Sequence, residues 1–268
     1  MRSTSNPAFR NLPTGQSGYA SFGSSGGGLM GGGAAYADTR AAQQMDYGRA
    51  GTERPITIDD IVQKTAICAG LAIVAGLATA VTGLYVLALP AFIVGFVVSL
   101  VVIFKKTVSP WLVLTYSVAM GIALGGIAGL INQQFPGIAF QALIGTAGVF
   151  VGMLVVYKTG AVKVTPRFTK WLIGAMIGVV VLMLANLVAG LFGVNMGLRD
   201  GGPLAIIFSL VVIGVAAFSL LLDFDAADQA VRAGAPAKFA WYIAFGLMTT
   251  LVWLYIEILR LLTYLRGD

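Results

Sequence analysis

The feature that most constrains this chain is a series of seven apolar runs, each about as long as a membrane-spanning helix. Overall, 58% of the residues are hydrophobic and 10% are charged, whereas an average soluble domain has about 25% charged residues. We therefore expect an all-α integral membrane protein, built as a seven-transmembrane-helix bundle. The predicted spans are 65–85, 87–104, 111–131, 138–157, 171–192, 204–222 and 239–265.

The charges of the connections predict how the bundle is oriented. Every second connection is basic, beginning with the segment before the first span, and those between are nearly free of basic residues apart from Arg199. By the positive-inside rule, we expect a multi-pass protein of the plasma (inner) membrane with a cytoplasmic N-terminus. The residues on the basic side are Arg49, Arg54, Lys64, Lys105, Lys106, Lys158, Lys163, Arg167, Lys170, Arg232 and Lys238.

The first 57 residues differ in composition from the remainder. The stretch Ser21–Ala34 is rich in glycine and serine and has almost no apolar cluster, so it cannot bury enough surface to offset the entropy of ordering. We expect 1–57 to be a disordered cytoplasmic tail and 58–268 to be the membrane domain. Thr57 or Asp59 is suited to cap the first helix.

Several kinds of function are disfavoured by what the sequence lacks. The chain contains no histidine and a single cysteine, Cys68, which removes histidine-based metal sites and serine–histidine hydrolysis. Its basic residues are dispersed rather than gathered in a basic and aromatic patch, so we expect no nucleic-acid partner. We expect no enzyme, no catalytic residue, no resident metal and no cofactor.

The candidate site residues are carboxylates in or beside apolar runs, where charge is costly and is usually functional. Asp223 and Asp225 close the sixth run, and Glu257 lies inside the last run. The two aspartates are about 200° apart on a helix, so they cannot both face one partner. Glu257 either pairs locally with Arg260, three residues on, or meets an acid of the sixth span. Two carboxylates that meet share a proton and form a pH sensor or a cation site.

Two further patterns bear on packing and charge. Lys105 and Lys106 either supply a counter-charge to these acids or only fix the topology. Glycines recur every fourth residue in three spans, and this spacing predicts close helix packing within the bundle. These glycines are Gly121, Gly125 and Gly129, then Gly148 and Gly152, then Gly174 and Gly178.

Short motifs around the acids resemble a known family. Phe224-Asp225 is followed by Gln229, and the last span contains Tyr255-Ile256-Glu257 with Leu261 four residues later. With seven spans and basic connections on one side, 59–266 resembles the Bax inhibitor-1 family, in particular its bacterial branch. The resemblance implies a bundle with a central last helix and a pH-dependent calcium leak gated by an aspartate pair on spans six and seven. Eukaryotic members suppress cell death, and some bacterial members restrain a membrane protease.

Carried onto this chain, the resemblance implies roles for particular residues. The sixth-span aspartate corresponds to Asp225, with Asp223 as the alternative register, and Glu257 replaces the seventh-span aspartate. Lys105 or Lys106 stands where family members often have arginine. We therefore predict a pH-sensitive cation leak channel with calcium as the transported ion. The alternative is a non-conducting regulator that binds other membrane proteins.

Overall fold

The computed structural model describes residues 54–105, 109–193 and 196–267, all within one compact unit, Glu53–Asp268. In this part of the chain, seven helices are long and apolar enough to cross a membrane, which confirms the predicted fold class. The helices are α2 (Ile58–Thr82), α3 (Ala88–Lys105), α4 (Pro110–Gln134), α5 (Ile138–Thr159), α6 (Pro166–Leu191), α7 (Pro203–Arg232) and α8 (Ala240–Gly267), with short 3-10 helices η2 (Tyr85–Leu87) and η3 (Ala237–Phe239).

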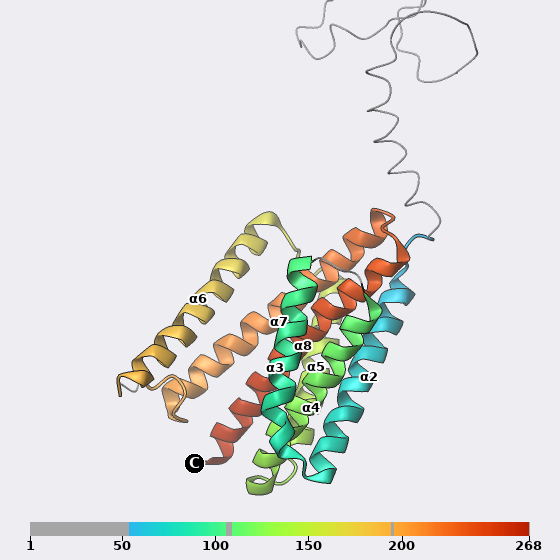
Figure 1. The fold of residues 1–268 in the computed structure, drawn as a ribbon. Helices are drawn as coiled ribbons and strands as arrows, with labels where there is room; N and C mark the ends of the chain where they lie inside the picture. The colour runs from blue at the N-terminus through green and yellow to red at the C-terminus, as the bar shows by residue number, and fades with distance from the viewer. Residues whose placement is uncertain (1–53, 106–108, 194–195, 268) are drawn as a thin grey trace, which may run out of the picture. The chain divides into compact units, whose positions relative to one another are not determined.

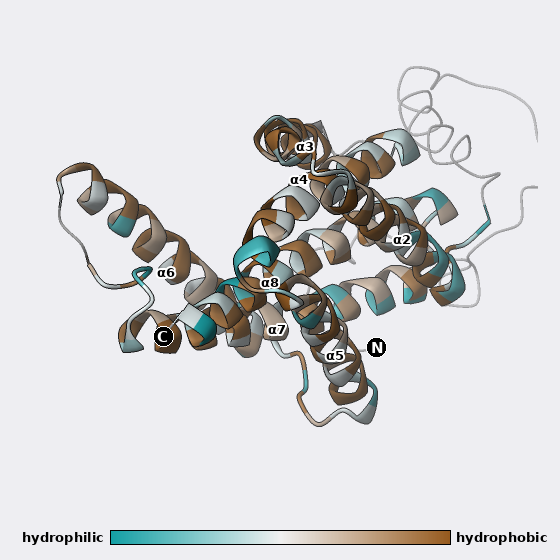
Figure 2. Cartoon of the chain, turned by 90° about the horizontal axis from the view of Figure 1, so that it is seen from below, coloured by the Kyte–Doolittle hydropathy of each residue, from teal (hydrophilic) through white to brown (hydrophobic). Residues whose placement is uncertain are grey.

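The last helix occupies the middle of the bundle. Helix α8 packs against α2, α4, α5 and α7, and its span is the most buried of the seven. By contrast, α6 packs on α7 and lies at the edge of the bundle (Figure 1). Viewed from below, α3 and α6 are mainly apolar helices on the outside (Figure 2). The central last helix implied by the family resemblance is therefore confirmed.

The glycine spacing has different consequences in different helices. On α4, side-chain atoms at Gly121 and Gly125 would collide with the backbone of Ala72 and Gly76 on α2, so these two helices touch backbone to backbone. On α5 and α6, a Cβ added at Gly148, Gly152, Gly174 or Gly178 would have nothing within 4 Å. The prediction of bundle packing is therefore confirmed for α4 and wrong for α5 and α6, because glycine spacing does not say which surface approaches.

A short extended segment ties the start of the described chain to the connection between α7 and α8. The Ile56 N–H donates to the Ala235 carbonyl at 2.8 Å, and the Ala237 N–H donates to the Arg54 carbonyl at 3.0 Å. Ile56 is buried at 2% exposure. These residues were placed in the predicted tail, but their backbone pairing makes them part of the bundle. Residues 1–53 of that tail lie outside the described residues.

The start of α2 agrees with the sequence pattern. Thr57 is the N-cap, its hydroxyl accepts from the Asp60 N–H, and the Asp60 carboxylate accepts from the Thr57 N–H. Arg54 also donates two hydrogen bonds to Asp60, at 2.6 and 2.7 Å. This reciprocal arrangement satisfies backbone donors that a helix start leaves unpaired. The Asp60 carboxylate therefore joins the helix cap to the extended segment.

Helix α7 extends well beyond its predicted span, and α6 begins before its own. Helix α7 runs to Arg232, ten residues beyond Leu222, so Asp223 and Asp225 lie within the helix. Alanine, glutamine and arginine in this extension favour helix, and its backbone needs no apolar run. Helix α6 begins at Pro166, after the N-cap Thr165. Phe168 of α6 packs edge-on against Phe218 of α7, with the ring centroids 5.9 Å apart.

Candidate functional site

Asp223 lies where α7 packs against α8. Its Oδ2 accepts a hydrogen bond from the Thr250 hydroxyl of α8 at 2.7 Å. The neighbouring Leu221 and Phe224 are buried, and Asp223 itself is half-buried. A carboxylate in this setting loses much of its hydration, and one hydroxyl replaces only part of it. Asp223 is therefore the acid of α7 that faces the central helix.

The other two acids at this end of α7 bond elsewhere. The Asp225 carboxylate accepts from the Gln229 side-chain amide at 2.6 Å, one turn along the same helix. Asp228 pairs with Arg232 at 2.7 Å and accepts from the Tyr157 hydroxyl of α5 at 3.3 Å. These contacts agree with the expectation that Asp223 and Asp225 do not face one partner. Of the two registers left open by the sequence, Asp223 is the one directed at α8.

Glu257 lies within α8 and is almost completely buried, at 2% exposure. Its Oε1 accepts a hydrogen bond from Arg260 at 2.8 Å and lies 3.9 Å from the Arg199 guanidinium. Its Oε2 is buried and has no hydrogen-bond partner among the described residues. Arg199 comes from the connection between α6 and α7, so two chain segments bring positive charge to this carboxylate. The local Glu257–Arg260 pair, one of the two predicted arrangements, is formed.

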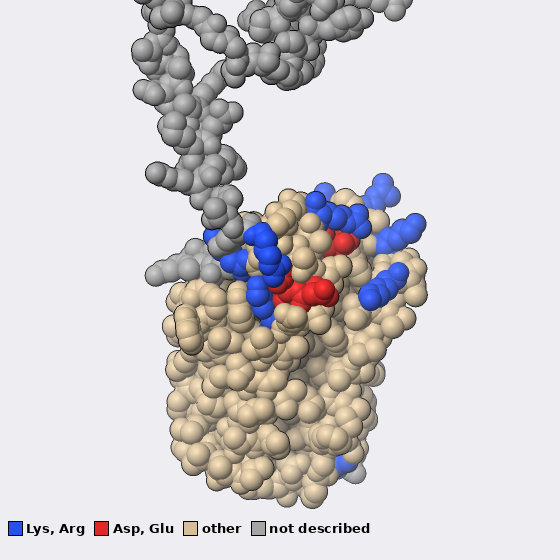
Figure 3. Space-filling view, turned by 90° about the vertical axis from the view of Figure 1, so that its right-hand side faces the viewer, with Lys and Arg blue, Asp and Glu red and all other residues tan. Residues whose placement is uncertain are grey.

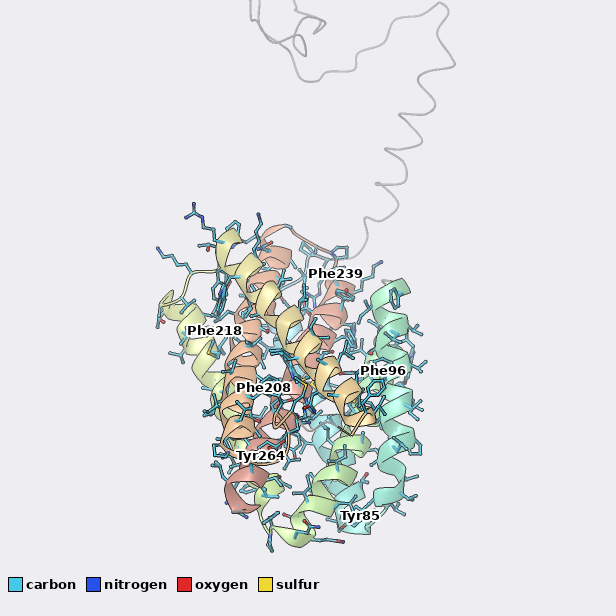
Figure 4. The ribbon with its side chains drawn as sticks, turned by 90° about the vertical axis from the view of Figure 1, so that its left-hand side faces the viewer. Tyr85, Phe96, Phe208, Phe218, Phe239 and Tyr264 are labelled. Atoms are coloured by element: carbon cyan, nitrogen blue, oxygen red, sulfur yellow. The ribbon has the colours of Figure 1, made fainter. Side chains whose placement is uncertain are left out.

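The two carboxylate positions lie at different levels along α8. Thr250, the partner of Asp223, precedes Glu257 by seven residues, which is two helical turns or about 10 Å. Figure 4 shows the direction of this helix, with Phe239 just before its start and Tyr264 near its end. In the described part of the chain, no hydrogen bond or ion pair joins Glu257 to Asp223 or Asp225. The predicted proton-sharing contact is thus not made in this conformation.

Possible metal ligands are not gathered elsewhere either. Within 54–105, 109–193 and 196–267, no group of three or more histidine, cysteine, aspartate or glutamate side chains is placed to hold a metal ion.

Comparison with known families agrees with this architecture. A family model described as Bax inhibitor 1 like matches residues 6–267. The chain belongs to the Bax inhibitor 1 like family. The match reaches beyond the expected 59–266 and includes most of the segment predicted to be a tail. A comparison with curated proteins finds no match.

Two counter-charges inferred from the Bax inhibitor 1 resemblance stay predictions. Lys105 is the last residue of α3, and its side chain is outside the described part of the structure, as is the whole of Lys106. Arg260 does contact Glu257. Assignment to the bacterial branch of the family also stays a prediction, as do the roles of Asp223, Asp225 and Glu257 in pH sensing.

Sequence reasoning missed two residues of the site. Thr250 lies two turns before Glu257 on α8, and this spacing would have placed both on one helix face. Arg199 is a lone basic residue in a connection that is otherwise free of them, and this isolation was the signal of a specific partner. Both residues contact an acid that the sequence singled out.

Proposed function

We propose that this Bax inhibitor 1 like protein is a pH-sensitive cation leak channel in which Asp223 and Glu257 act in succession along the α7–α8 interface. Calcium is the transported ion, and the protein has no resident cofactor and no catalytic residue. The observation that carries the proposal is that Asp223 of α7 bonds to Thr250 of the central helix, and that the almost fully buried Glu257 lies about two turns further along that helix. With this spacing, a cation that moves along the α7–α8 interface meets two separate positions instead of one shared site. We call the position at Asp223 the first station and the position at Glu257 the second station.

At the first station, protonation of Asp223 determines whether a cation is attracted. The ionised carboxylate provides an oxygen ligand of the kind that calcium prefers, and the Thr250 hydroxyl beside it is a second oxygen. Protonation removes the charge and leaves a neutral group. Cation entry at this level is therefore favoured as pH rises and opposed as pH falls.

At the second station, the conformation described here opposes cation passage. Glu257 is held by Arg260 and faces Arg199, so two positive charges surround one negative charge. A cation passing this level must displace at least one guanidinium from the carboxylate. We infer that opening requires α7 and the connection that carries Arg199 to move relative to α8.

Calcium flux into liposomes that contain the purified full chain tests this proposal. We expect flux to rise from about pH 5 to pH 8, by up to about tenfold per pH unit below the pKa of the controlling carboxylate. Asp223→Asn and Glu257→Gln should each flatten this dependence. Asp225→Asn is the matched control and should behave like the wild type, because Asp225 bonds to Gln229 on its own helix.

Absent flux, or a pH dependence unchanged by both Asp223→Asn and Glu257→Gln, would favour the second candidate function. That candidate is a non-conducting regulator that binds other membrane proteins. It is supported by α6, whose glycine face at Gly174 and Gly178 meets no other part of the described chain. Such a face lets another membrane helix approach closely.

The proposal also includes the orientation of the protein in the membrane. By alternation of the helices, the N-terminus of α2 and the α3–α4, α5–α6 and α7–α8 connections lie at one end of the bundle. Lysine and arginine side chains gather at one end of the face seen in Figure 3, and the remainder of that face is almost free of them. We infer that this end is cytoplasmic and that the protein spans the plasma (inner) membrane.

A further inference from the structure

A small pocket lies beside the Glu257 cluster, at the outer helix α6. Its volume is ≈ 290 Å³, close to the lower end of the range for small-molecule sites, about 300–1,000 Å³. Its lining consists of the Arg199 side chain from the α6–α7 connection and of Met183, Leu184, Asn186 and Leu187 from one stretch of α6. The pocket therefore combines three apolar side chains with the Asn186 amide and one cation.

Two guanidinium groups and two carboxylates lie in the cluster beside this pocket. Arg199 and Arg260 both approach the Glu257 carboxylate, and the Asp200 carboxylate acts on Tyr264 in the same cluster. The Arg199–Glu257 distance of 3.9 Å is an ion pair without a hydrogen bond, and among the described residues the Arg199 guanidinium donates none. Burial, and then the nearby positive charge of Arg260, lower the pKa of Arg199, and Glu257 offsets this effect only in part. An anion beside Arg199 would offset the cost of burying the guanidinium and the repulsion from Arg260.

The apolar wall of the pocket is open to the bilayer. The span of α6 is the least buried of the seven, and Leu184 and Leu187 are 55% and 61% exposed. Lipid acyl chains are the natural covering of such a surface. Arginine is also suited to phosphate, because its planar fork can donate two parallel hydrogen bonds.

We propose that Arg199, supported by Arg260, binds the phosphate of an anionic phospholipid, with an acyl chain of that lipid lying along Met183–Leu187 of α6. The phosphate accepts hydrogen bonds from the Arg199 guanidinium, which donates none among the described residues, while Glu257 remains paired with Arg260. This site shares Arg199 with the second station of the proposed cation path, but the rest of its lining comes from α6. The lipid also joins α6 to the central helix at a level where the protein itself provides little contact between them.

Native mass spectrometry of the full chain in detergent, with phosphatidylglycerol and phosphatidylcholine added together, tests this site. We expect the wild type to retain phosphatidylglycerol about tenfold better, and Arg199→Gln to lower that preference by about tenfold, as expected for loss of a charge-assisted contact. Arg266→Gln is the matched control. It removes the same charge near the same end of α8, from an exposed side chain bonded to Pro136 and Gln141, and should leave the preference unchanged.

A second variant keeps the charges and alters the wall. Leu187→Trp places a bulky side chain in the pocket and should reduce retention of phosphatidylglycerol with Arg199 intact. The proposal is overturned if the wild type shows no preference, if Arg199→Gln and Arg266→Gln act alike, or if millimolar inorganic phosphate displaces the lipid, which would indicate a site for free phosphate. Because binding is measured without flux, these outcomes are independent of the test of ion conduction.

Discussion

Helices α4 and α6 both carry glycines four residues apart, but the two helices are held in the bundle in different ways. On α4, Gly121 and Gly125 contact the backbone of α2, and more than half of the α4 span is buried. On α6, Gly174 and Gly178 meet nothing within 4 Å, and the span is 11% buried. Helix α6 is instead joined to its neighbours by long side chains, such as Phe168 on Phe218.

This difference shows what small-residue spacing does and does not specify. The spacing makes close approach sterically permissible, and whether a partner helix in the same chain uses it depends on the arrangement of the whole bundle. The α2–α4 side depends on backbone proximity, where almost no substitution is tolerated. The α6 side depends on aromatic rings and on the Arg199–Glu257–Arg260 cluster, where loss of one group leaves others in place.

The largest effect is expected from Gly125→Leu. Even a Cβ at this position would overlap the Gly76 backbone, so α2 and α4 must separate. The loss in free energy of unfolding should exceed the about 3 kcal/mol of ordinary overpacking. Thermal unfolding in detergent measures it, with Gly148→Leu on α5 as the control, since Gly148 meets open space. If Gly125→Leu and Gly148→Leu were equally stable, close backbone packing would not distinguish α4 from the helices whose glycines meet open space.

An intermediate effect is expected from Arg260→Gln. The change removes the 2.8 Å hydrogen bond to buried Glu257 and should cost about 1.5–3 kcal/mol. We expect a loss of stability near the lower end of this range, because the Arg260 side chain is 24% exposed and Arg199 remains near the Glu257 carboxylate. Denaturant titration measures the loss. Adding Glu257→Gln should restore part of the stability, and no restoration would show that the charge pair does not hold this side of the bundle.

The smallest effect is expected from Gly178→Ala on α6. The added methyl group meets nothing in the described chain, and alanine favours helix over glycine by about 1 kcal/mol. Stability should therefore stay the same or rise slightly in a thermal melt of the purified protein. A clear loss of stability would indicate that the glycine face of α6 is already covered by another helix in the purified protein.

Much of the fold follows directly from apolar runs and basic connections, because a bilayer requires both. The seven spans, the Thr57 cap and the Glu257–Arg260 contact were all predictable from local sequence. Hydropathy reports where a helix is apolar, however, and not where it ends. This is why the predicted sixth span stops at Leu222, although α7 continues for ten more residues.

Long-range contacts of the site could not be predicted in the same way. Arg199 reaches Glu257 because the α6–α7 connection brings it to the lower turns of α8, and no local pattern encodes that path. The pairing of Asp223 with Thr250 depends on the axial register of α7 against α8. A shift of one residue in this register would have placed Leu222 or Phe224, and no acid, opposite the hydroxyl.

The length of α7 has a consequence for the membrane around it. At 30 residues it is about 45 Å long, whereas the hydrocarbon core is about 30 Å thick, and α3 with 18 residues is about 27 Å long. A bilayer that suits α3 is too thin for α7, which must tilt or project from it. Asp223 lies nine residues before the end of this helix, about 13 Å along its axis. Thinning of the bilayer therefore moves the Asp223 carboxylate toward water, and thickening draws it into hydrocarbon.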